Sequence, residues 1–109
     1  MGDWRTHAGI DIKGALGAKV TAAADGKVAD ILRDDMLGTV VVVDHGFGML
    51  SYSANLASSP TVKVGDTVSA GSVIGAIGST ALGETGDVSH LHFELRLNGA
   101  PVDPAAYLR

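Results

Sequence analysis

Short runs of β-branched and apolar residues, separated by glycine-containing turns, recur along the whole chain. Nowhere do apolar residues recur at helical spacing for three turns. The pattern is typical of strands joined by tight turns, and it predicts an all-β protein, an antiparallel β-sandwich or open barrel. The expected strands are residues 20–24, 27–32, 39–44, 49–52, 73–77 and 90–97, and the run at 62–68 is expected to carry a turn at Gly65-Asp66.

The dipeptide Asp25-Gly26 stands between the runs at 20–24 and 27–32. Asp-Gly between two apolar runs is a strong signal for a two-residue β-hairpin. We therefore expect these two runs to pair with each other.

Residues 39–44 are apolar on both faces, which predicts a strand that is buried on both sides. Gly46-Phe47-Gly48 is expected to turn the chain back after this strand. The longest irregular stretch, residues 78–89, runs directly into His90, so we expect this loop to border a functional site.

The run from His90 to Leu97 carries the first part of the candidate chemistry. Successive side chains of a strand face opposite ways, so His90, His92 and Glu94 share one face, opposite an apolar face. Two histidines on one face, about 7 Å apart, can serve a single metal centre.

His7 and Asp11 form a second polar pair near the N-terminus. Together with His92 they would supply two imidazoles and one carboxylate, a ligand set typical of catalytic zinc, which keeps a fourth position for water. Zinc in such a site activates water and polarises a substrate carbonyl. Because His7 and Asp11 would lie about 13 Å apart in a straight strand, we expect a bend at Gly9. His7 with Asp11 alone would be a weak signal and His90 with His92 alone a moderate one, and the two motifs together indicate a site. The remaining histidine, His45, is interpreted as a turn residue without a chemical role.

The composition narrows the classes of function. A length of 109 residues with 46% hydrophobic residues fits one domain with an apolar core. The net charge of −4, without a cluster of Lys and Arg, argues against a nucleic-acid surface. No apolar run reaches the length of a membrane span, and the absence of cysteine excludes thiolate zinc sites and cysteine nucleophiles. The first residues lack the apolar segment of a signal peptide, and we interpret this start as the boundary of a domain within a longer protein.

Several motifs together make the chain resemble the LytM-type, or M23, zinc metallopeptidases, which cut peptide cross-bridges in bacterial cell walls. The resemblance runs from Trp4 to Leu108, and its motifs are at residues 7–12, 24–28, 43–48, 62–68, 71–75 and 90–94. It implies one LytM-type domain over residues 1–109, largely antiparallel, with a core of residues 4–108 and a groove over one sheet. It also implies that His7, Asp11 and His92 bind zinc and that His90 is one of two histidines that serve the reaction.

One position departs from this family pattern. Family peptidases carry the second catalytic histidine in a segment like Thr-x-Tyr-Ala-His-Leu, and this chain has Asn55 at the place of that histidine and Ser53 at the place of the tyrosine. An amide does not exchange a proton near neutral pH, although it can donate a hydrogen bond to a developing oxyanion. Losing a general acid or base typically costs roughly 10²–10⁴-fold in rate. We therefore expect cleavage of peptidoglycan peptides to be weak or lost.

Two other functions are open from the sequence. The chain is similar to the sporulation protein Q branch in Trp4-Arg5-Thr6 and in residues 35–38, and that branch implies a non-catalytic zinc-binding domain that binds a protein partner. With either function we expect an extracytoplasmic location in the cell envelope, with a membrane anchor in the full-length protein. Ranked third is a biotinyl or lipoyl carrier domain, which the motifs at 24–28 and 62–66 also resemble. Such a carrier displays a lysine at a hairpin tip, and no lysine of this chain has that setting.

Overall fold

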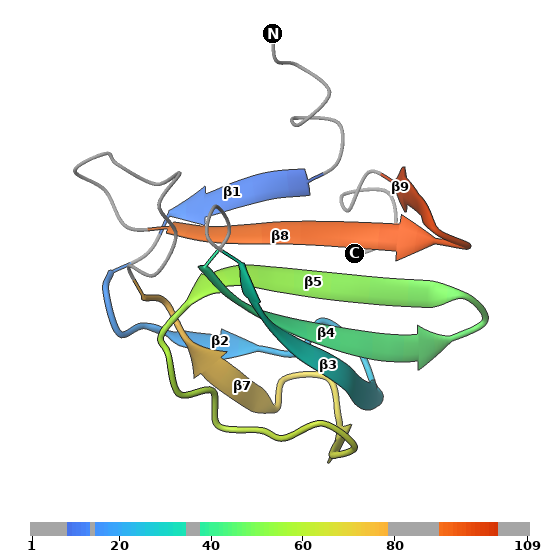
Figure 1. Cartoon of the computed structure of the whole chain (residues 1–109), viewed down its shortest axis with the longest axis horizontal. Helices are drawn as coiled ribbons and strands as arrows, with labels where there is room; N and C mark the ends of the chain where they lie inside the picture. The colour runs from blue at the N-terminus through green and yellow to red at the C-terminus, as the bar shows by residue number, and fades with distance from the viewer. Residues whose placement is uncertain (1–8, 14, 35–37, 79–89, 103–109) are drawn as a thin grey trace, which may run out of the picture.

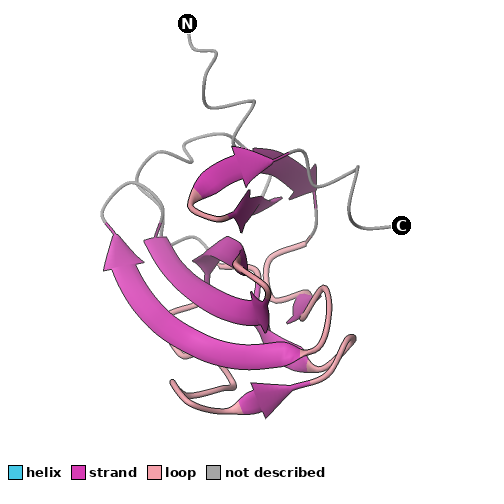
Figure 2. Cartoon of the chain, turned by 90° about the vertical axis from the view of Figure 1, so that its right-hand side faces the viewer, coloured by secondary structure: helices cyan, strands magenta, loops and turns pink. Residues whose placement is uncertain are grey.

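The computed structural model describes residues 9–13, 15–34, 38–78 and 90–102, of which residues 9–13 and His90 are placed by their backbone and strand pairing. The described residues form strands and turns without a helix (Figure 2). The strands are β1 (Gly9–Lys13), β2 (Lys19–Thr21), β3 (Gly26–Asp34), β4 (Gly38–Gly46), β5 (Met49–Leu56), β6 (Thr67–Val68), β7 (Val73–Ala76), β8 (His90–Leu97) and β9 (Ala100–Val102). All pairings between them are antiparallel, which confirms the predicted fold class.

The strands form two sheets of unequal size. A seven-stranded sheet has the order β1-β8-β5-β4-β3-β6, and β9 pairs with β8 off this path. β1 pairs with the first half of β8 and β9 with its second half, so both lie along the same edge of β8 (Figure 1). β2 and β7 form a two-stranded sheet of their own.

The two sheets pack around one apolar core. Val20 and Ile74 of the small sheet lie in the same buried cluster as Val28, Val41 and Val43 of the large sheet. Aliphatic side chains buried in this way contribute about 1.5–3 kcal/mol each. This contact joins the small sheet to one face of the large one.

The other face of the large sheet carries a second, smaller apolar cluster. It is formed by Val40 and Val42 of β4 with Ala54 of β5, and Leu50 and Tyr52 pack against it. Because alternate residues of β4 enter the two clusters, the prediction that this strand is buried on both sides is confirmed.

The hairpin predicted at Asp25-Gly26 is wrong. β2 pairs with β7, whereas β3 pairs with β4 and β6, so the dipeptide carries the chain from one sheet to the other. The Asp25 carboxylate accepts a hydrogen bond from the Ala70 amide at 2.8 Å, which holds it to a distant loop. A Cβ on Gly26 would clash with the carbonyl oxygen of Asp44 in β4. Contacts with residues far away in the sequence therefore explain why Asp and Gly stand here. A local dipeptide pattern cannot reveal such contacts.

The turn predicted at Gly65-Asp66 is confirmed, since Gly65 has a φ of 96° and the Asp66 amide donates to the Lys63 carbonyl at 3.0 Å. The short strand Thr67–Val68 follows it. After β8, Asn98 and Gly99 both have positive φ (53° and 86°) and turn the chain into β9, a strand that was not predicted. Residues 79–89, in the loop expected to border the site, lie outside the described residues. The described part of the chain contains no helix that could cross a membrane.

Candidate active site

Strand pairing places two of the predicted metal ligands opposite each other. Asp11 of β1 is the antiparallel partner of His92 in β8, and Lys13 is the partner of His90. Directly opposed residues in such a pair have Cβ atoms about 4.5–5.5 Å apart, so residues at these positions can bind one ion. His7, the third predicted ligand, lies outside the described residues, and Gly9, the expected bend, is the first residue of β1.

Zinc binding itself stays a prediction. Among the side chains that the structure describes, no group of three His, Cys, Asp or Glu residues could hold a metal ion. The side chains of Asp11 and His90 are not among them, and neither is any part of His7.

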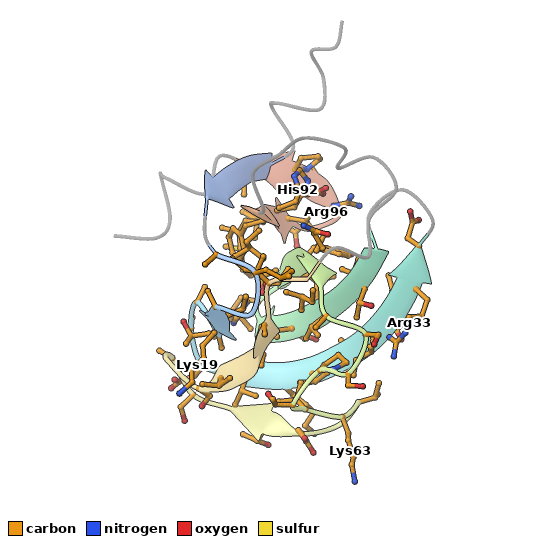
Figure 3. The ribbon with its side chains drawn as sticks, turned by 90° about the vertical axis from the view of Figure 1, so that its left-hand side faces the viewer. Lys19, Arg33, Lys63, His92 and Arg96 are labelled. Carbon is orange, nitrogen blue, oxygen red and sulfur yellow. The ribbon has the colours of Figure 1, made fainter. Side chains whose placement is uncertain are left out.

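The described part of the site is a chain of three polar side chains on one face of β8. Nε2 of His92 lies 3.0 Å from Oε2 of Glu94, and Nη2 of Arg96 donates to Oε1 of Glu94 at 2.9 Å. The intervening Phe93 and Leu95 are buried, which confirms that β8 has one polar and one apolar face. Figure 3 shows His92 and Arg96 together on this strand, away from the other labelled basic side chains.

The immediate surroundings of Glu94 keep it ionised. The hydrogen bond from His92 lowers the pKa of Glu94 most, and Arg96 lowers it further, whereas burial acts in the opposite direction. The net result is a pKa below the usual value, so this largely buried carboxyl group is a carboxylate at neutral pH. The Arg96 guanidinium carbon also lies 4.6 Å from the ring centroid of Tyr52, a cation–π distance.

Asn55 occupies an irregular point of β5. Val41 pairs with Ser53 and Thr39 pairs with Leu56, so β5 has one residue more than β4 between these two pairs. This is a β-bulge, a feature that is common beside active sites because it re-aims a side chain.

The bulge gives Asn55 a left-handed backbone, with φ of 63°. Asparagine and histidine adopt this conformation more readily than most residues. Asn55 is buried, and its carbonyl accepts a hydrogen bond from the Gly78 amide at 2.9 Å. Its neighbour Ala54 is the β5 partner of His92, so strand pairing brings the position at which the family resemblance implies a histidine next to β8.

His45 has a different position from the one expected. It lies within β4 rather than in the following turn, with Nδ1 2.8 Å from the Asp25 carbonyl oxygen and Nε2 2.8 Å from Oγ of Ser51. Because a carbonyl only accepts, Nδ1 of His45 donates to the Asp25 carbonyl, and Nε2 shares a second hydrogen bond with the Ser51 hydroxyl. Ser51 is 2% exposed, so this serine–histidine pair is a structural link between strands rather than an accessible nucleophile.

Arg96 and Tyr52 are members of the site that the sequence analysis missed. Strict alternation along β8 places Arg96 on the face of His92 and Glu94, so the pattern contained that signal. Tyr52 is the β5 partner of Glu94, a relationship that only strand pairing reveals.

Comparisons with known proteins agree with this architecture. The model of peptidase family M23 matches residues 5–104. The DD-carboxypeptidase/endopeptidase Mpg of Neisseria meningitidis serogroup B is 38% identical over 103 residues, which cover 94% of this chain and 23% of Mpg. The murein hydrolase activator NlpD of Escherichia coli is 36% identical over 104 residues, covering 92% of this chain and 25% of NlpD. Stage II sporulation protein Q of Bacillus subtilis is 33% identical over 102 residues, covering 92% and 35%.

These values have two consequences. The chain spans 23–35% of the length of these relatives, so it corresponds to one part of each. The sporulation protein is one of several similar relatives, and the identities do not single out its branch.

Solved structures show the same similarity in three dimensions. A putative M23 peptidase from Pseudomonas aeruginosa superposes with a TM-score of 0.83 at 36% identity, over 94% of this chain and 44% of that chain. A zinc-containing peptidase from Vibrio cholerae gives a TM-score of 0.81 at 33% identity, over 89% and 29%. With its family motifs, its paired β1 and β8 and the match over residues 5–104, this chain belongs to peptidase family M23.

Proposed function

We propose that this chain is a zinc-binding domain of the bacterial cell envelope that binds peptidoglycan peptides and cleaves them weakly or not at all. The observation that carries the proposal is the pairing of Asp11 with His92 across β1 and β8, which brings a carboxylate residue and an imidazole residue from distant parts of the chain to one point. The names of Mpg, a DD-carboxypeptidase/endopeptidase, and of NlpD, a murein hydrolase activator, support a role at the cell wall. Family membership leaves the carrier-domain alternative without support.

Zinc fits the donors that the chain offers. His7, Asp11 and His92 would hold it, and two imidazoles with one carboxylate are a common catalytic set. Nε2 of His92 is already held by a carboxylate, an outer partner typical of metal-ligating histidines. When bound, zinc supplies a Lewis acid that activates water and polarises a carbonyl.

The remaining roles fall to two residues on neighbouring strands. His90 stands two residues before His92 on β8, and we assign it proton transfer or hydrogen-bond donation to the developing oxyanion. Asn55 can donate a hydrogen bond but cannot transfer a proton. Since the family places a histidine there, turnover is expected to be slower by roughly 10²–10⁴-fold.

A second candidate function is a non-catalytic interaction domain that binds a protein partner in the cell envelope. Asn55 favours it, as does the similarity to stage II sporulation protein Q. In both cases the domain would lie outside the cytoplasm, anchored through another part of a longer chain.

The decisive experiment incubates the zinc-loaded domain with purified cell walls and with bridge peptides. Sedimentation with the walls would measure binding, and mass spectrometry of released fragments would measure cleavage. Binding with little or no cleavage supports the main proposal. Turnover at the level of intact family peptidases would overturn the proposal that cleavage is weak or absent. Failure to bind or cut the walls would favour the protein-partner alternative.

A further inference from the structure

On the polar face of β8, three side chains are connected in series, and the first of them, His92, is a predicted metal ligand. His92, Glu94 and Arg96 are linked by contacts of 3.0 Å and 2.9 Å, and the Arg96 guanidinium lies over the Tyr52 ring at 4.6 Å. Tyr52 is the β5 partner of Glu94, so this series ties two strands together beside the site.

Glu94, the middle residue of this series, determines which ring nitrogen of His92 carries the proton. A carboxylate has acceptors and no proton, so the contact between Glu94 and His92 is a hydrogen bond that Nε2 of the ring donates. In a neutral imidazole only one nitrogen carries a proton, and the other presents its lone pair. With the proton on Nε2, the lone pair of His92 lies on Nδ1, which is the atom that could bind a metal.

Glu94 is also held in place. Its side chain is 10% exposed, and its second oxygen accepts from Arg96. That bond, and the stacking of Arg96 on Tyr52, restrict the rotation of the carboxylate, and the guanidinium compensates its buried charge. The ring of His92 is thereby oriented by a rigid neighbour.

We propose that Glu94 is a positioning residue that fixes His92 in the tautomer with its proton on Nε2 and its lone pair on Nδ1, and that Arg96, stacked on Tyr52, holds Glu94 in place. The inference rests on the proposed function in taking His92 as a metal ligand. It adds the atom through which His92 binds and the residues that select that atom.

The first test uses the metal-free protein and therefore does not depend on zinc. Histidine ring nitrogens would be observed by ¹⁵N NMR at about pH 8.5, well above the ordinary histidine pKa. The wild type should show His92 protonated at Nε2, and Glu94→Ala should give a mixture of tautomers. Glu94→Gln keeps the shape and an acceptor oxygen, so it should retain more of the Nε2 tautomer than Glu94→Ala.

The second test measures zinc affinity by competition with a chelator. Loss of an outer partner of a metal-bound histidine typically weakens metal binding by about 10–100-fold, which is the loss expected for Glu94→Ala. Arg96→Ala should give a smaller loss, and Glu94→Gln a partial rescue. Asp30→Ala is the matched control, because it removes a carboxylate from β3 of the same sheet, where it bonds to the Ile31 amide.

The outcomes separate the two proposals. If the wild type binds zinc and Glu94→Ala binds it as tightly as Asp30→Ala does, the positioning role is overturned. An unchanged His92 tautomer in Glu94→Ala overturns it as well, whether or not zinc binds. A wild type that binds no zinc would instead overturn the proposed function, and the tautomer measurement would then decide alone whether Glu94 orients His92. Glu94→Gln and Arg96→Ala keep both tests usable if Glu94→Ala fails to fold.

Discussion

Asp11 and His92 are direct antiparallel partners, although 80 residues lie between them in the sequence. A site built on this pair depends on each member, because two remaining ligands do not hold a catalytic-type zinc ion. We expect His92→Ala to abolish tight zinc binding, measured by elemental analysis after gel filtration. His45→Ala removes a histidine outside the predicted ligand set and should keep zinc. Stoichiometric zinc in His92→Ala would contradict the ligand assignment.

Restoring a histidine at position 55 should raise cleavage. The bulge already provides the left-handed backbone, which histidine tolerates, so Asn55→His changes the side chain without demanding a new main-chain conformation. The expected gain in kcat/KM on bridge peptides is up to about 10²–10⁴-fold, the usual contribution of a general acid or base.

The control for this substitution is Asn55→Gly, which accepts the same backbone conformation and offers no proton donor. It should show no gain. If Asn55→His also shows none, the groove has lost productive substrate binding as well as proton transfer.

Phe47 should be replaceable with a gain in stability. It is fully exposed at the tip between β4 and β5, and its φ of 56° is strained for a bulky side chain. Left-handed backbone costs roughly 1–2 kcal/mol for most residues, and glycine avoids this cost at the expense of a more flexible unfolded chain. Urea denaturation should therefore show Phe47→Gly to be more stable than the wild type by up to about 1 kcal/mol. A clear loss of stability would mean that the phenyl ring makes a contact that its exposure does not suggest.

The link between His45 and Ser51 should be visible as an energetic coupling. Removing one partner leaves a part-buried polar atom without its hydrogen bond, which typically costs about 1–3 kcal/mol. Ser51→Ala and His45→Ala should each destabilise the domain, and the double variant should lose less than the sum. Denaturant unfolding of all three variants would measure this, with the exposed Ser59→Ala as a control. Strict additivity would show that the hydrogen bond contributes nothing to stability.

Features that depend on neighbouring residues could be predicted from the sequence. The bounds of β8 and its two faces followed from strict alternation, and the burial of β4 followed from its valines. The strand β9 was missed because Pro101 argues against a strand, although proline is tolerated at a sheet edge.

The rest depended on partners far along the chain. Asp25 accepts a hydrogen bond from the Ala70 amide, and Gly26 lies against the backbone of β4. The dipeptide therefore serves contacts with distant residues and does not form a local hairpin. Local spacing in the sequence shows neither that Tyr52 faces Glu94 nor that β5 gains a residue at Asn55, because both follow from the register of strands that meet only in the folded sheet.

In the described part of the large sheet, β1 is an edge strand and its one neighbour is β8. An ion shared by Asp11 and His92 would staple this border strand to the interior of the sheet. Binding of the ion and docking of β1 would then be coupled by thermodynamic linkage, so each would stabilise the other. Chelation should consequently expose the amide hydrogens of residues 9–13 to exchange before those of β4.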